Sequence, residues 1–306
     1  MLEMLRAELH CHNVYSNGHV GDLEPPFDSN VTLNEQLENS LKSKLDILFV
    51  TNHNTLDGLK QITDYKNNHK KFSNLEIYPA IEITTDKEAH VLVYGLHEEI
   101  KSNQTIDEIL DAAKSQDAVT IAPHPFSLID SLRDDSLKCD LFEVFNSSNI
   151  DIYSNKKAEI FAKEKNLLTV AGSDSHVAST IGRCTNIIDA QNNLDDVIYA
   201  MKKGKTSIEK TEYVTHSEVL EHIQYKIENS KEYIDQYVNE FYPKYFWLFN
   251  MMFKSYMFTK KSFVWYIVFK IALSGIRRIS YKINFEGYDP YAFRTRDIPT
   301  ITKMIF

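Results

Sequence analysis

The chain has 306 residues and a formal net charge of −9, so it is long enough for one large domain or a domain with an appendage. The excess of acidic side chains argues against a general polyanion-binding protein, and no apolar run reaches the roughly 20 residues that a membrane-spanning helix needs. The three cysteines, Cys11, Cys139 and Cys184, lie far apart in a sequence without a signal-peptide pattern, so we expect reduced thiols in a cytoplasmic protein.

Alternating strand and helix patterns run along residues 6–210. Capping-box sequences at 32–35 and 105–108 predict the starts of two helices. Short apolar runs predict buried strands at residues 46–51, 75–82, 90–95, 118–122, 140–145, 167–171 and 185–188. Strands that alternate with helices through short connections favour a parallel sheet, and about seven such units would form a barrel. The sequence therefore predicts an α/β barrel.

The composition changes after this predicted barrel. Residues 241–306 carry 11 basic and 3 acidic side chains and 19 of the 36 aromatics, whereas residues 1–240 carry 23 basic and 40 acidic side chains. We predict a barrel over residues 1–210, and a helical linker followed by a basic, aromatic-rich region over residues 211–306. Three interpretations of this region stay open: a helical subdomain packed on the barrel, an amphipathic region that lies on an anionic membrane surface, and a nucleic-acid-binding surface.

Histidine and acidic side chains gather at the ends of the predicted strands. His10 and His12 follow one another at i and i+2 on an extended segment, which places both imidazoles on the same side. His90 is an exception, because it begins its strand instead of ending it. Reactive groups of barrels lie at the carboxyl ends of the strands, so we expect a shared pocket. The residues at or just beyond strand ends are His12, His53, Glu82, His124, Asp174 and His176.

This mixture of several imidazoles and two carboxylates predicts a metal site. It suits Zn²⁺, Mn²⁺ or Fe²⁺ better than Mg²⁺ or Ca²⁺, which prefer oxygen ligands. The groups outnumber the ligands of one tetrahedral ion, so we expect two or three divalent ions that share a bridging carboxylate. Ions roughly 4 Å apart can clamp an in-line displacement at phosphorus and lower the pKa of a bridging water.

These motifs resemble, in the same order along the chain, the PHP (polymerase and histidinol phosphatase) domain family. The motifs that carry the resemblance are residues 8–12, 15–18, 50–55, 81–84, His90, 122–126, 143–146 and 172–176. The resemblance covers about residues 6–210. It implies a distorted (β/α)7 barrel with a two- or three-metal phosphoesterase site.

By position, the resemblance also implies a role for each ligand. The implied metal ligands are His10, His12, His53, Glu82, His90, His124, Asp174 and His176. The first ion, and the catalytic water bound to it, would be held by His10, His12, Glu82 and Asp174, with Glu82 bridging. His90 and His124 would complete the second ion's ligands, and His53 and His176 would hold the third ion.

The sequence departs from the family pattern at Asn17 and Asn52, where the family usually has aspartate. An amide oxygen is a poorer metal ligand than a carboxylate, so the third ion would bind weakly unless His19 replaces the missing group. Arg183 follows the last ligand pair, and its guanidinium has the fork geometry that binds a substrate phosphate. A surface position for Arg183 is an equally acceptable interpretation.

The resulting hypothesis is a metal-dependent hydrolase of phosphate esters, acting on a phosphorylated small molecule or on the end of a nucleic acid. Two alternatives stay open. One is an amidohydrolase-type metal hydrolase, which usually needs a bridging lysine where this chain has Glu82. The other is a non-catalytic PHP-like binding module, in which the asparagine replacements have disabled the site.

Overall fold

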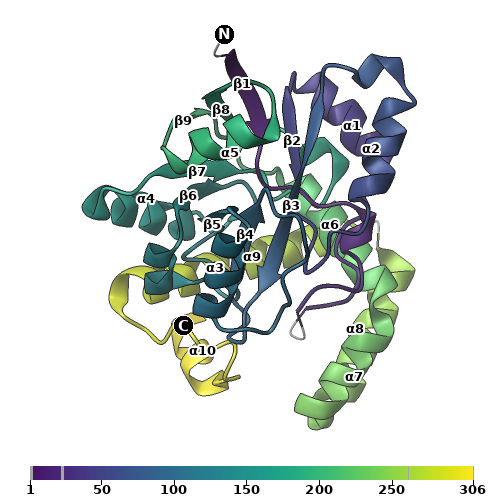
Figure 1. Cartoon of the computed structure of the whole chain (residues 1–306). Helices are drawn as coiled ribbons and strands as arrows, with labels where there is room; N and C mark the ends of the chain where they lie inside the picture. Colours follow the sequence, from purple (N-terminus) through teal and green to yellow (C-terminus); the bar gives the residue numbers. More distant parts are fainter. Residues whose placement is uncertain (1–2, 22–23, 261, 306) are drawn as a thin grey trace.

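The structure of the chain, a computed structural model, describes residues 3–21, 24–260 and 262–305. Nine strands form one curved sheet in the order β7-β6-β5-β4-β3-β2-β1-β8-β9, with helices around it (Figure 1). The sheet nearly closes on itself, because the Asn186 side chain in β8 (Thr185–Ala190) bonds both the N–H and the C=O of Ala171 in β7 (Thr169–Gly172). The predicted distorted α/β barrel is confirmed.

The sheet is mixed, not parallel throughout. Strands β1 (Glu3–Glu8), β2 (Ile47–Val50) and β3 (Glu76–Thr84) run parallel, as do β5 (Val119–Ala122), β6 (Leu141–Asn146) and β7. Strand β4 (His90–Tyr94) is antiparallel to β3 and β5, and β8 is antiparallel to β1 and to β9 (Thr206–Lys210). The expected parallel sheet is wrong at these strands. The segment between β3 and β4 is too short for the crossover that parallel strands need.

The helices beside the barrel are α1 (Leu33–Lys42), α2 (Leu59–Asn67), α3 (Ile106–Ser115), α4 (Tyr153–Lys165) and α5 (Leu194–Lys202). Both predicted capping boxes are present: the hydroxyls of Thr32 and Thr105 accept from the backbone N–H three residues on. Large side chains such as Phe49 and Tyr94 fill the core and are fully buried. This packing fixes the strand ends, where the candidate ligands lie.

The C-terminal region is helical, as predicted. Its helices are α6 (His216–Asn229), α7 (Lys231–Phe241), α8 (Phe246–Thr259), α9 (Phe263–Glu286) and α10 (Ile298–Ile305). Helix α9 packs on α4, while α7 and α8 extend as a pair away from the barrel (Figure 1). Among the described helices, none has the length and apolar character needed to cross a membrane.

Candidate metal centre

Glu82, at the end region of β3, is the central carboxylate of the site and is 1% exposed. Its Oε1 lies 3.0 Å from His90 Nδ1 and 3.1 Å from His124 Nε2. Its Oε2 lies 3.3 Å from His10 Nε2 and 3.2 Å from His12 Nε2. His53 Nδ1 lies 3.5 Å from the same Oε2. The two carboxylate oxygens therefore face different imidazoles, which is the geometry of a bridging ligand.

His90 belongs to the site despite its position at the start of a strand. Because β4 runs antiparallel to β3, the first residue of β4 lies at the same edge as the last residues of β3, and Thr84 pairs with His90. Its ring nitrogen therefore reaches Glu82. His90 is therefore no exception to the grouping of ligands at one edge of the sheet, because the antiparallel direction of β4 places its first residue at that edge.

Asp174, just beyond β7, closes the other side of the cluster. Its Oδ1 lies 3.4 Å from His10 Nε2 and 3.3 Å from His12 Nε2. Both Asp174 (φ 50°) and His124 (φ 28°) have a left-handed backbone conformation, which is uncommon for residues other than glycine. Such strained positions persist where the surroundings hold them, and they are frequent at functional sites.

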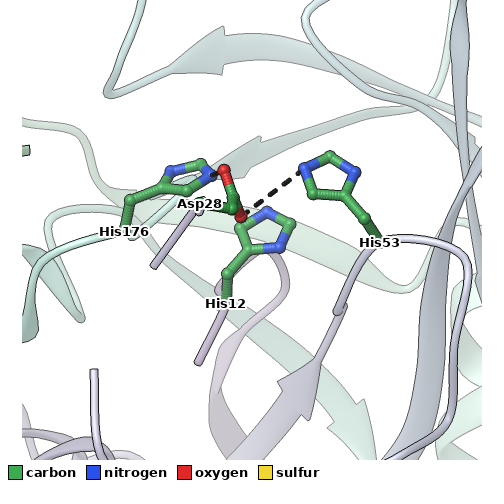
Figure 2. A group of neighbouring side chains, drawn as sticks. All are labelled: His12, Asp28, His53 and His176. Atoms are coloured by element: carbon green, nitrogen blue, oxygen red, sulfur yellow. Dashed lines mark ion pairs between the residues drawn. The ribbon is translucent and has the colours of Figure 1, made fainter. Parts of the chain in front are cut away.

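A third group of ligand atoms contains Asp28, which the sequence analysis did not single out. His12, Asp28, His53 and His176 face one another (Figure 2), and their ligand atoms lie within 4.8 Å of each other. Asp28 Oδ1 is 3.1 Å from His176 Nε2, and Oδ2 is 3.8 Å from His53 Nε2. Asp28 lies in an irregular proline-containing loop, where no periodicity marks it.

Asn17 and Asn52 have structural roles here. Asn17 Oδ1 accepts from the backbone N–H groups of Asp28 (2.6 Å) and Ser29 (3.0 Å), so Asn17 holds the loop that carries the carboxylate. Asn52 exchanges hydrogen bonds with Asn13. The proposed substitute His19 is not part of any ligand group among the described residues. Asp28 thus supplies the carboxylate that the sequence was expected to lack.

Asp130 is a second acidic residue that sequence reasoning missed. Its Oδ1 lies 3.4 Å from His124 Nδ1, and its Oδ2 lies 4.0 Å from His90 Nδ1. It belongs to the loop that follows β5, and the Asp130 backbone carbonyl accepts from the N–H of His90. As with Asp28, an acidic residue in a loop has no spacing signal that would distinguish it from a surface residue.

Glu143 and Gly172 position His10. Glu143 Oε1 is 3.0 Å from His10 Nδ1, so the imidazole donates there and its Nε2 faces Glu82. Glu143 Oε2 accepts from the N–H of His124 at 2.6 Å. A methyl group at Gly172 would lie 1.8 Å from Glu143 Oε1 and 2.7 Å from His10 Cβ. Only glycine leaves room for this pair, so Gly172 is required for the site.

Helix α6, from the C-terminal region, forms one wall of the third group. Lys226 Nζ lies 3.5 Å from Asp28 Oδ1 and 3.1 Å from Glu24 Oε2. His222 donates from Nε2 to the Asp28 carbonyl (2.8 Å) and stacks on His176, with ring centroids 4.6 Å apart. The predicted division at residue 210 stays a prediction, but residues beyond it reach the site.

Arg183, the predicted phosphate-binding residue, is paired with carboxylates of the C-terminal region. One guanidinium nitrogen lies 2.6 Å from Glu218 Oε1, and the other lies 3.3 Å from Glu212 Oε2. Lys226 is a positively charged side chain that does contact the third ligand group, through Asp28. Substrate binding by Arg183 stays a prediction.

Burial and neighbouring charges together set the pKa values of these groups. Burial lowers the pKa of His53 to about 4, so this imidazole is neutral at pH 7. Burial also lowers the pKa of His124, but Asp130 and Glu82 outweigh it and raise the pKa to about 10. Burial raises the pKa of the Asp28 carboxyl, yet His176 and Lys226 hold it well below its usual range.

The donor set fits divalent cations. In the described part of the chain, buried ring nitrogens of His12, His53, His90 and His124 have no hydrogen-bond partner. Unpartnered buried polar atoms are costly, and five overlapping groups place such atoms within 4.8 Å of neighbouring carboxylate oxygens or imidazoles. Ions shared among these atoms would satisfy them, and the nitrogen-rich set suits Zn²⁺, Mn²⁺ or Fe²⁺.

Comparison with known proteins gives related sequences and a related fold. A family described as PHP-associated matches residues 153–206. An uncharacterised protein from Methanocaldococcus jannaschii is 31% identical over 151 residues, which cover 48% of this chain and 85% of the relative. The structure of PsfC from Pseudomonas syringae PB-5123 is similar at a TM-score of 0.54 and 16% identity, over 73% of this chain and 98% of PsfC. The lesion-specific endonuclease PfuEndoQ from Pyrococcus furiosus, at a TM-score of 0.49 and 17% identity, is similar over 67% of this chain and 58% of its own.

A barrel with imidazoles and carboxylates gathered at one end is the arrangement of a metal-dependent hydrolase. Within that class, the chain belongs to the PHP family. The family resemblance predicted from the motifs is therefore confirmed, whereas the likeness to PsfC adds support for the fold alone.

Proposed function

We propose that this protein is a phosphoesterase that uses two or three divalent ions (Zn, Mn or Fe) to hydrolyse phosphate esters. The observation that carries the proposal is the position of Glu82, whose two oxygens face separate pairs of imidazoles at 3.0 to 3.3 Å. A shared carboxylate of this kind is typical of sites that hold adjacent ions. When bound, such ions supply Lewis acidity at the phosphate and activate water near neutral pH.

The residues of the chain divide this work. The first ion would be held by His10, His12, Glu82 and Asp174, the second by Glu82, His90 and His124, and the third by His12, Asp28, His53 and His176. Asp130 lies beside the other ring nitrogen of His124, Nδ1. Glu143 accepts from Nδ1 of His10, which fixes the neutral tautomer whose Nε2 can bind an ion and makes that nitrogen more basic. Lys226 is the cation that would attract the negatively charged phosphate to the third group.

The two alternatives are supported less well. An amidohydrolase-type site needs a lysine between its ions, and a carboxylate, Glu82, has the central place here. A disabled binding module would lack an acidic ligand in the third group, and Asp28 supplies one. Neither Asn17 nor Asn52 therefore argues for loss of activity.

The test combines metal analysis of the purified chain with a substrate panel of phosphomonoesters, phosphodiesters and single-stranded oligonucleotides. We expect at least two equivalents of transition metal and metal-dependent turnover of one substrate class, lost on chelation and restored by readdition. Hydrolysis of p-nitrophenyl phosphate alone would favour a phosphorylated small molecule, and release of terminal nucleotides would favour a nucleic-acid end. Metal-replete protein that is idle on the whole panel would contradict the proposal.

A further inference from the structure

Helix α8 has an unusual combination of composition and exposure. Ten of its 14 residues are apolar or aromatic and Lys254 is its one charged residue, yet none of its side chains is buried. A helix that is apolar on all sides is normally buried in a core or in lipid. The first interpretation of this region, aromatics packed on the barrel, does not describe α8.

The outward side of α8 is an apolar stripe. Trp247, Met251 and Phe258 share one side of the helix by their spacing, and they are 66%, 54% and 91% exposed. Phe263, 71% exposed, follows across the turn that joins α8 to α9. We call Trp247, Met251, Phe258 and Phe263 the apolar stripe.

The opposite side of α8 borders a groove of about 340 Å³ between α6, α7, α8 and α9. Its lining is apolar and includes Ile223, Phe253 and Val268. The C-terminal helices therefore leave apolar surface uncovered on both sides of α8. Uncovered apolar surface of this extent marks an interaction site.

The charges around the apolar stripe point to an anionic partner. Lys254 lies on the same side as the stripe, one helical turn from Phe258, and Lys244 precedes α8. Within the described residues, neither lysine forms an ion pair, and both are exposed. Residues 241–306 carry a surplus of 8 positive charges, from 11 basic and 3 acidic side chains.

We propose that α8 and the start of α9 dock on the surface of an anionic phospholipid bilayer, with the apolar stripe among the acyl chains and the lysines at the headgroups. A second copy of the chain fits less well, because it would bury Lys254, which lies on the same side of α8 as the stripe, against another apolar face. Nucleic acid also fits less well, because Met251 and the exposed Ile267 and Ile271 have no aromatic face to stack on bases. The helix of 14 residues is about 21 Å long and cannot cross a hydrocarbon core of about 30 Å.

Vesicle flotation of the full chain tests this proposal. The vesicles are an equimolar mixture of phosphatidylglycerol and phosphatidylcholine, with pure phosphatidylcholine as the comparison. The two tryptophans of the chain both lie in this region, Trp247 in α8 and Trp265 in α9, so intrinsic fluorescence reports on it directly. We expect flotation and a blue shift with the anionic vesicles, both weakened at about 1 M salt because the charges are screened.

Three variants separate the contributions. Trp247→Ser/Phe258→Ser/Phe263→Ser removes three large side chains and should reduce partitioning at least about 100-fold. Lys244→Gln/Lys254→Gln should reduce it about fivefold per lysine. Tyr199→Ser in α5, where the side chain is 57% exposed, should leave it unchanged. Circular dichroism checks that each variant is folded.

Several outcomes would overturn the proposal. These are no binding to anionic vesicles, equal binding to both kinds of vesicle, and a triple variant that binds like the wild type. A dimer in solution that the triple variant abolishes would assign the apolar stripe to a second copy. Oligonucleotide binding that depends on the stripe would assign it to nucleic acid. Metal content is measured alongside, so that failure of this proposal is distinguished from failure of the phosphoesterase proposal.

Discussion

The metal centre inside the barrel and helix α8 outside it differ in the groups that each leaves without a partner. In the barrel, apolar side chains are buried and the unsatisfied groups are imidazole nitrogens, such as those of His12 and His90. In α8, the groups without a partner are apolar side chains, none of which is buried against the rest of the described chain. The first arrangement calls for cations and the second for an apolar phase. The chain therefore has two surfaces suited to different partners: a polar site that can bind cations and an apolar helix surface that can bind lipid.

The largest effect should follow removal of a ligand from the barrel. Asp174→Ala and His124→Ala should each reduce turnover at least about 10³-fold, more than the roughly 10–100-fold typical of a group that only supports a ligand. Steady-state kinetics on the active substrate would measure the loss. Circular dichroism should show an intact fold, and near-normal turnover in either variant would place the active site elsewhere.

Metal binding should strengthen steeply with pH. Carboxylates raise the pKa of His124 to about 10 and that of His176 to about 9 against the opposing effect of burial, so both carry a proton at neutral pH before metal binds. Each of the two ions must displace one of these protons, so the affinity of each site should rise about tenfold per pH unit between about pH 6 and 8.

Competition with a metal indicator across this range measures the slope. Proton release, followed in weakly buffered solution, should reach at least two per protein, because neighbouring carboxylates also raise the pKa values of His10 and His90. An affinity that does not change with pH would mean that these two imidazoles are not ligands.

A pair of glycine substitutions compares the metal centre with the C-terminal helices. Gly172→Ala places a methyl group 1.8 Å from Glu143 Oε1 and should lower metal affinity or activity about 10–100-fold. Gly275→Ala, in α9, meets no atom within 4 Å and should be neutral or stabilise the helix by about 1 kcal/mol. Isothermal titration with Zn²⁺ and thermal unfolding of both variants test this contrast. Equal behaviour of the two would remove the steric role of Gly172.

The smallest expected effect is on KM, and it tests which of two basic side chains, Lys226 or Arg183, binds the substrate phosphate. Lys226→Gln should raise KM about tenfold with little change in kcat, because the ammonium group faces the third ligand group. Arg183→Gln should change KM less, since the carboxylates that its guanidinium contacts, Glu212 and Glu218, belong to none of the ligand groups among the described residues. The opposite order would restore Arg183 as the phosphate-binding residue.

Much of the site could be predicted from the sequence, because its ligands follow strand ends in a characteristic order. His10, His12 and Glu82 lie together as the motifs implied. The direction of β4 could not be predicted, since the apolar pattern of a strand is the same in both directions. His90 was therefore placed by the family resemblance and not by geometry.

The residues that sequence reasoning missed share another cause. Asp28 and Asp130 lie in loops, where no periodicity distinguishes a ligand from a surface acid. Lys226 and His222 come from a helix about 200 residues along the chain from Asp28, and only the tertiary fold brings them there. The exposure of α8 could not be predicted either, because an aromatic-rich sequence is compatible with both a buried core and an exposed surface.

The ion pair between Lys226 and Asp28 has a practical consequence for truncation. A fragment that stops at the end of β9 would keep every predicted ligand, yet it would lose the ammonium group that Asp28 faces at 3.5 Å. Removing one partner of a buried pair typically costs about 3–5 kcal/mol. We therefore expect a fragment that ends after Asn229, the last residue of α6, to hold the loop that carries Asp28 more firmly than a fragment that ends at β9.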